Sequence, residues 1–195
     1  MRELKYLKAV VIVHGKSEKQ LTQYIKSKLR LKIKIESDKN GEKSIQITSL
    51  DRFINNKKFK NLNSFLRNFE DAELNANGKK LNEKFKIFII MDTDDCTENQ
   101  KEAFINKTMF KQHWAYDNIV PIYNSQNLEE VLTKAKIPFE KKGDKRKKEY
   151  IKIFPTDKKY ERSDEIQIND LKEKLSVIKS TNLDEFFEFC LEIAE

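Results

Sequence analysis

Two runs of apolar residues dominate the pattern of hydrophobic and polar positions along the chain. Residues 8–13 read KAVVIV and residues 85–91 read FKIFIIM, and polar or charged residues follow each run. Short runs with so few charges are typical of strands buried on both faces of a parallel sheet. Residues 118–123, NIVPIY, form another such run. Its Pro121 predicts an edge strand or a strand end, because proline removes a donor from the hydrogen-bond ladder.

Two further segments, residues 31–35 and 44–48, alternate between apolar and polar residues. Between them, Asp38-Lys39-Asn40-Gly41 carries the Asn-Gly signal of a tight turn. The two segments either form a hairpin, or one of them is the second parallel strand. We favour Ile45–Thr48 as the strand of the sheet.

Amphipathic segments separate the predicted strands. Ser17 fits the N-cap of a helix over residues 18–31, whose apolar positions are spaced for one inward face. Similar spacings predict helices over residues 50–56, 62–74 and 97–111. The alternation of strands and helices specifies an α/β fold. It has a mostly parallel sheet of four strands, or slightly more, flanked by helices in a Rossmann-like arrangement.

The last third of the chain is predicted to be helical. Residues 1–125 form the α/β domain, and residues 126–195 form a helical extension that packs on it and does not fold independently. The charge run over residues 140–148 is interpreted as a solvated loop or helix start, with contact to a phosphate backbone as the alternative. The expected helices cover residues 128–135, 145–154, 168–179 and 183–194.

Composition limits the class of protein. The 195 residues suit one domain, and a net charge of +7 with a pI near 9.2 permits a polyanionic partner such as RNA or DNA. No segment approaches the roughly 18 apolar residues of a membrane span, and no signal-peptide cleavage site follows the first apolar run. Cys96 and Cys190 are far apart in sequence and are expected to be free thiols in a reducing cytoplasm.

Candidate chemistry gathers where three predicted strands end. The first strand leads into residues 14–18, the 85–91 strand into residues 92–95, and the 118–123 strand into residues 124–129. Parallel strands end at one edge of their sheet, so these segments are expected to converge there. Asp92 and Asp94 stand two positions apart, and both can point to one side of an extended backbone, where they would seat Mg²⁺ or Mn²⁺. The alternative is that these acids only open a turn and cap the next helix.

The strand that ends in HGKSE, the helix after it and the later strand that ends in Asp-x-Asp resemble the TOPRIM domain. That family includes topoisomerases, bacterial primases, small RNA-processing nucleases and nucleases of phage-defence systems. The resemblance covers about residues 8–130. It implies that Asp92 and Asp94 bind Mg²⁺ or Mn²⁺, with Asp95 extending the pair. The segment NSQNLEEVL is similar to an Asn-x-x-x-Glu segment of defence-associated members, which makes Glu129 a further candidate acid.

His14 departs from the family pattern, which has a catalytic glutamate at this position. A histidine can accept a proton near neutral pH or bind a metal, but it cannot supply a carboxylate charge. Glu18 lies one helical turn further on and can point back to the same site. Three readings follow: an altered but active site, a metal site served by Glu18 and Glu129, or a site without catalysis.

The remaining residues of the turn are candidate substrate-binding residues. Gly15 permits a close backbone approach, and Lys16 and Ser17 at a helix start can hold a phosphate through backbone N–H groups. The spacing is not that of a P-loop, which excludes a nucleotide triphosphatase of that kind.

The leading hypothesis is a cytoplasmic, Mg²⁺- or Mn²⁺-dependent TOPRIM-like nuclease of phage defence or RNA processing. The alternative is a catalytically impaired module that binds nucleic acid or a protein encoded nearby. Neither hypothesis involves a membrane, and the sequence leaves the oligomeric state and the choice between RNA and DNA open. A phosphoacceptor receiver domain is set aside, because no lysine follows the strand at residues 118–123.

Overall fold

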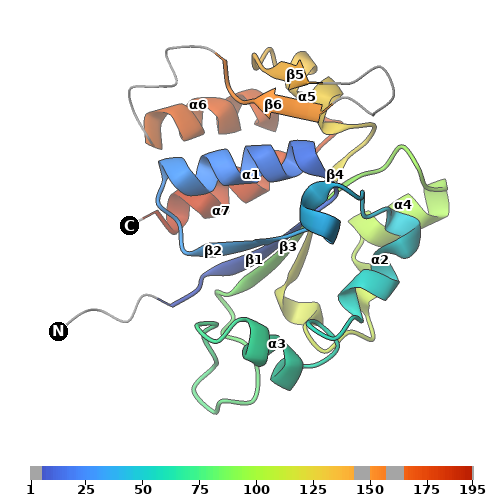
Figure 1. The fold of residues 1–195 in the computed structure, drawn as a ribbon, viewed down its shortest axis with the longest axis vertical. Coiled ribbons are helices and arrows are strands. Elements are labelled where there is room, and N and C mark those ends of the chain that lie inside the picture. Colours follow the sequence, from blue (N-terminus) through green and yellow to red (C-terminus); the bar gives the residue numbers. More distant parts are fainter. Residues whose placement is uncertain (1–5, 143–149, 157–164, 195) are drawn as a thin grey trace.

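The two least charged runs of the sequence form the centre of a four-stranded parallel sheet. The computed structural model describes residues 6–142, 150–156 and 165–194 (Figure 1). The sheet has the strand order β2-β1-β3-β4 and all neighbours are parallel. Its strands are β1 (Ala9–Val13), β2 (Ile33–Glu36), β3 (Lys86–Asp92) and β4 (Ile119–Asn124). The predicted α/β fold with a parallel sheet is confirmed.

Helices cover both faces of the sheet (Figure 1). The helices on one face are α1 (Lys16–Lys28), α5 (Leu128–Lys134), α6 (Glu165–Ser176) and α7 (Leu183–Glu192). Those on the other face are α2 (Ile47–Ile54), α3 (Leu62–Asn68) and α4 (Glu98–Ile105). Short 3₁₀ turns, η1 (Asp38–Gly41), η2 (Thr108–Phe110) and η3 (Tyr116–Asn118), complete the connections. No helix within the described ranges has the length and apolar character to cross a membrane.

The alternation of side chains along β1 and β3 produces two separate cores. Val11 and Val13 of β1 and Phe88 of β3 pack in the core with α1 and the C-terminal helices. Val10 and Ile12 belong instead to the core with α2, α3 and α4. Successive residues of a strand point to opposite faces, so a strand covered on both faces needs apolar residues at every position. The edge position predicted from Pro121 is confirmed, because β4 is the last strand of the sheet.

The second parallel strand is residues 33–36, and the preference for Ile45–Thr48 was wrong, as was the hairpin alternative. Ile33 to Glu36 pair in register with Ala9 to Ile12 of β1. Charged residues, Lys34 and Glu36, alternate with isoleucines along β2 because this strand lies at an edge of the sheet and exposes part of its surface. Ile45 donates its N–H to the His14 carbonyl at 2.8 Å, and Ile47 begins α2.

A β-hairpin replaces part of the helix predicted over residues 145–154. Strand β5 (Glu140–Lys142) pairs antiparallel with β6 (Tyr150–Ile153), and residues 143–149 lie outside the described ranges. Ile151 and Phe154 are buried, whereas Lys152 and Ile153 between them are exposed. This spacing of three is compatible with one helical turn as well as with a strand end, which explains the wrong prediction.

Several other predicted helices differ in extent. Helix α3 ends at Asn68 instead of residue 74, and α4 ends at Ile105, before η2, instead of residue 111. Helix α1 begins at Lys16, so Ser17 is not its N-cap. The C-terminal helices α6 and α7 share a core with the sheet. The division at residue 125 into a domain and a dependent extension stays a prediction.

Candidate functional site

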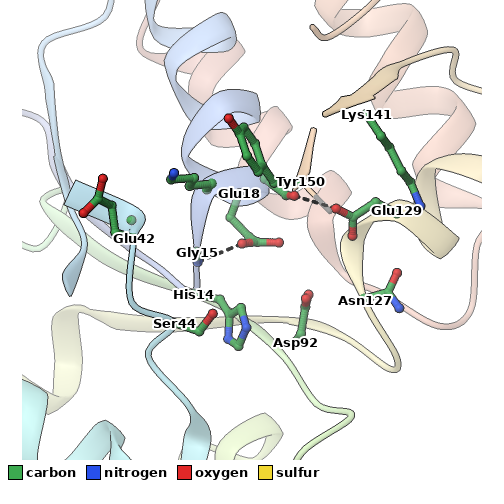
Figure 2. Close-up of a pocket in the computed structure, with 13 residues that line it drawn as sticks. His14, Gly15, Glu18, Glu42, Ser44, Asp92, Asn127, Glu129, Lys141 and Tyr150 are labelled. Atoms are coloured by element: carbon green, nitrogen blue, oxygen red, sulfur yellow. Dashed lines mark hydrogen bonds between the residues drawn. The ribbon is translucent and has the colours of Figure 1, made fainter. Parts of the chain in front are cut away.

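An open pocket of about 720 Å³ lies at the carboxyl edge of the sheet (Figure 2). The end of β1, the start of α1, the end of β3, the start of α5, the loop after η1 and the β5–β6 hairpin all contribute to its wall. The lining residues are His14, Gly15, Lys16, Ser17, Glu18, Gly41, Glu42, Ser44, Asp92, Asn127, Glu129, Lys141 and Tyr150. The predicted convergence of three segments at this edge is therefore observed.

The turn after β1 holds Glu18 at the pocket. Gly15 is the N-cap of α1 in an extended conformation, and its N–H donates to Glu18 Oε2 at 2.8 Å. A Cβ at Gly15 would lie 3.4 Å from Glu18 Oε2, in ordinary van der Waals contact with the carboxyl group. Glu18 is buried, with 1% of its surface exposed. This turn therefore fixes a charged group at the bottom of the site.

Ser17 connects three parts of the pocket wall. Its hydroxyl donates to Glu129 Oε1 of α5 at 2.5 Å and accepts the Ile151 N–H of β6 at 3.0 Å. Residues of α1, α5 and the hairpin are thereby joined through one side chain. Glu129 is thereby held with its carboxyl group at the pocket.

Asp92 is the last residue of β3, opposite Asn124 of β4. Asn124 Nδ2 donates to Asp92 Oδ1 at 3.0 Å, and the Thr181 hydroxyl donates to Asn124 Oδ1 at 3.0 Å. Asn124 is completely buried, and Asp92 is 5% exposed. The amide is therefore a fixed donor that orients the aspartate toward the pocket.

Burial and neighbouring acids raise the pKa of Asp92 well above its usual value. Loss of hydration is the largest cause, and the charge of Glu18 is the next. The hydrogen bond from Asn124 lowers the pKa, and the charges of Glu129 and Asp94 raise it further. The pocket thus collects negative charge that its own polar groups only partly offset.

Asp94 and Asp95 do not line the pocket. Strand β3 ends at Asp92, and residues 94 and 95 lie in a turn, Asp94 exposed and Asp95 half-buried. Side-chain alternation applies only along an extended strand, so the spacing of Asp92 and Asp94 does not by itself put both side chains on one side. Asp94 does influence Asp92 through its charge. Metal binding by Asp94 and Asp95 stays a prediction.

The donor set of the pocket fits a hard divalent cation in charge and chemistry. Carboxylate oxygens of Glu18, Asp92 and Glu129 are the ligand type that Mg²⁺ and Mn²⁺ prefer. Within the described ranges, no three or more His, Cys, Asp or Glu side chains are grouped closely enough to form a metal centre. Mg²⁺ commonly keeps several waters and uses only one or two carboxylates, so the set remains suitable for it.

Sequence reasoning missed several residues of the site. Gly41 has a φ of +86°, and a Cβ there would come within 3.5 Å of the Lys16 backbone. The Asn-Gly pair signalled this turn but not its contact with α1. Lys141 was interpreted as part of a solvated run, and Figure 2 shows its side chain pointing into the same region as Glu129. Tyr150 carried no signal, because it reaches the pocket through a hairpin that was predicted as a helix.

Comparison of this chain with models of protein families, with curated proteins and with solved structures gives no match.

Proposed function

We propose that this protein is a cytoplasmic, TOPRIM-like nuclease that uses Mg²⁺ or Mn²⁺ to cleave phosphodiesters of nucleic acid, in phage defence or RNA processing. One observation carries the proposal. Glu18, Asp92 and Glu129, from three distant segments, line one pocket at the carboxyl edge of a parallel sheet, which is where open α/β folds bind their ligands.

The electrostatics of these acids support a cation partner. An arrangement that served only stability would not bury Asp92 beside two other carboxylates, because burial and like charge both disfavour its ionised form. Groups with strongly shifted pKa values in an open pocket are more typical of functional sites than of structural ones. Glu18, Asp92 and Glu129 are the residues that would hold the cation. When bound, a divalent cation supplies positive charge that polarises a phosphate and activates a water molecule.

The other pocket residues would transfer a proton, bind phosphate and orient the carboxylates. The His14 imidazole lines the pocket and is the side chain suited to move a proton near neutral pH. Lys16 and Lys141 supply positive charge at the same pocket and can bind the phosphate oxygens of a substrate. Asn124 and Ser17 act by orientation, since they hydrogen-bond the carboxylates of Asp92 and Glu129.

A non-catalytic binding module is the second candidate. Two observations favour it: the position that resembles a catalytic glutamate is His14, and the described residues include no closely grouped set of three metal ligands. Such a module would hold nucleic acid or a protein partner without cleaving it.

Cleavage of a labelled oligonucleotide with Mn²⁺ or Mg²⁺ tests the proposal. We expect divalent-dependent cleavage by the native protein and its loss in Asp92→Asn, which keeps the acceptor for Asn124 but removes the charge. Asp117→Asn is the matched comparison, because Asp117 is exposed and outside the pocket, and we expect it to retain most activity.

Two results would count against the nuclease. Undiminished cleavage by Asp92→Asn would place the activity elsewhere or in a contaminant. Absence of cleavage by the native protein on single-stranded and duplex RNA and DNA would favour the binding module.

A further inference from the structure

A smaller hollow of about 270 Å³ adjoins the carboxylate pocket along helix α1. Lys16 and Tyr150 line both spaces, so the two are neighbours across these side chains. We call the smaller space the α1–β6 groove, defined by Lys16, Lys19, Gln20, Gln23, Tyr150 and Ile151. A ligand that reaches the carboxylates can therefore continue along α1.

The chemistry of the α1–β6 groove is opposite to that of the pocket. Among the described residues, its lining consists of two lysines, two glutamines, a tyrosine and an isoleucine, none of them an acid. Lys19 Nζ donates to the Asn40 carbonyl at 3.2 Å, and Lys16 Nζ lies 4.7 Å from the centre of the Tyr150 ring. In the part of the chain that the structure describes, neither lysine is ion-paired with a carboxylate. Both positive charges therefore remain for a negatively charged ligand.

The hairpin fixes Tyr150 against α1. The next residue, Ile151, is 1% exposed and donates its N–H to Ser17 Oγ at 3.0 Å. Phe154, after β6, packs its ring against Tyr24 of α1 with the ring centres 5.4 Å apart. Tyr150 thus lies at the junction of the pocket and the groove, on a strand that the buried contacts of Ile151 and Phe154 hold against α1.

We propose that a single strand of nucleic acid binds in the α1–β6 groove and from there presents a phosphodiester to the carboxylate pocket. Lys16 and Lys19 contact successive phosphates, and the Tyr150 ring stacks on an unpaired base. Lysines that follow a backbone, combined with an aromatic platform, are typical of proteins that bind single strands. Bases within a duplex keep their faces stacked on one another and cannot use such a ring. This inference rests on the proposed function, because nucleic acid is the substrate proposed for the pocket.

Fluorescence anisotropy in EDTA tests the inference without any cleavage. The probes are fluorescein-labelled RNA and DNA single strands of about 16 nucleotides, the upper end of the usual site size, and the duplexes of the same sequence. We expect the single strands to bind more tightly than the duplexes. Tyr150→Leu should weaken single-strand binding about fivefold or more, whereas Tyr150→Phe keeps the ring and should bind like the native protein.

Charge variants distinguish binding in the α1–β6 groove from non-specific binding of nucleic acid to a basic protein. Lys16→Gln and Lys19→Gln should each reduce the slope of log affinity against log salt by about 0.7, the value for one lost phosphate contact on a single strand. Lys84→Gln is the matched control, because Lys84 is exposed directly before β3, at the amino edge of the sheet. Gln23→Glu adds a negative charge on an exposed position of α1 and should also weaken binding.

Equal binding of duplex and single strand would overturn the inference. So would an unchanged affinity in Tyr150→Leu, or equal effects of Lys84→Gln and Lys16→Gln. Circular dichroism of each variant tests whether it folds. If Tyr150→Leu does not fold, Gln23→Glu replaces it as the test, and unchanged single-strand binding by that variant would overturn the inference. If the protein binds single strands in EDTA but cleaves nothing with Mn²⁺, only the proposed nuclease activity is contradicted. If the protein cleaves duplexes but does not bind single strands, only the inference of single-strand binding in the α1–β6 groove is contradicted.

Discussion

Asp92 is unfavourable for the stability of the fold, and under the proposed function it is a ligand of the cation. It ends an apolar strand, where the sheet excludes water, and it faces Glu18 and Glu129 across the pocket. A single hydrogen bond from Asn124 compensates only part of this loss of hydration. We infer that the native fold tolerates Asp92 because a ligand needs it.

The substitution Asp92→Asn should therefore stabilise the protein in metal-free buffer. The folded-state pKa of Asp92 is raised above its unfolded value, so the ionised carboxylate lowers the free energy of unfolding. This unfavourable contribution is complete above the folded pKa and disappears as the pH falls toward about 3.8. We expect a gain of roughly 0.5–2 kcal/mol near pH 7.5, the usual range for such replacements. Urea unfolding in EDTA at pH 7.5 and at pH 4.5 measures it, and the gain should be smaller at the lower pH. A loss of stability at pH 7.5 would contradict the electrostatic argument.

His14 is the residue where the resemblance and this chain differ, so replacing it is informative. His14→Glu would add a carboxylate to a pocket that Glu18, Glu42, Asp92 and Glu129 already line, which should lower the unfolding temperature in EDTA because like charges repel one another there. Mn²⁺ should raise that temperature more in His14→Glu than in the native protein. Thermal unfolding with and without Mn²⁺ is the measurement, and His14→Gln is the neutral control. An identical Mn²⁺ effect in all three proteins would exclude a cation beside residue 14.

At the scale of elements, the β5–β6 hairpin gives the pocket its outer wall. It contributes Lys141 and Tyr150, and it is attached to α1 and α5 through Ser17. Neither the hairpin nor its attachment could be predicted from local pattern. Three residues of β5 and four of β6 are too short for a clear two-residue period. The Ser17 contacts join residues more than a hundred positions apart.

Removal of the Ser17 hydroxyl should loosen the hairpin. Ser17→Ala deletes the acceptor of the Ile151 N–H and the donor to Glu129, and a buried group left without its partner costs about 1–3 kcal/mol. We expect faster amide hydrogen exchange at Ile151. Ser27→Ala is the control on the same helix, because Ser27 is exposed and only accepts a bond from Gln23. Equal exchange at Ile151 in both variants would mean that Ser17 does not hold the hairpin.

Much of the central architecture could be predicted because β1 and β3 are covered on both faces and must be apolar at every position. The edge strand β2 is less buried, and its alternation of apolar and charged residues made it no more strand-like than residues 44–48, which lead into α2. At the site, the positions of Glu18, Asp92 and Glu129 followed from strand ends alone. Asp94 did not, since the strand stops before it and a turn sets its direction.

At the scale of the whole molecule, α7 closes one of the two cores. Cys190 of α7 is completely buried, and burial raises the pKa of its thiol. Cys96 is half-buried near the end of β3, and burial also raises the pKa of its thiol. Because the thiolate is the reactive form, Cys190 should react only when α7 leaves the core. We expect Cys96→Ser, which leaves Cys190 as the single thiol, to resist a thiol reagent until urea unfolds it. Rapid labelling of that variant in native buffer would show that α7 is not stably packed.

A calorimetric titration with Mn²⁺ tests the central claim, that carboxylates of the pocket, Glu129 among them, bind one divalent cation. Glu129 lines the pocket, whereas its neighbour Glu130 does not and lies 4.0 Å from Lys134. We predict that the native protein and Glu130→Gln bind one Mn²⁺ with similar affinity and that Glu129→Gln binds about tenfold more weakly or worse. No Mn²⁺ binding by the native protein, or equal binding by Glu129→Gln and Glu130→Gln, would contradict the claim.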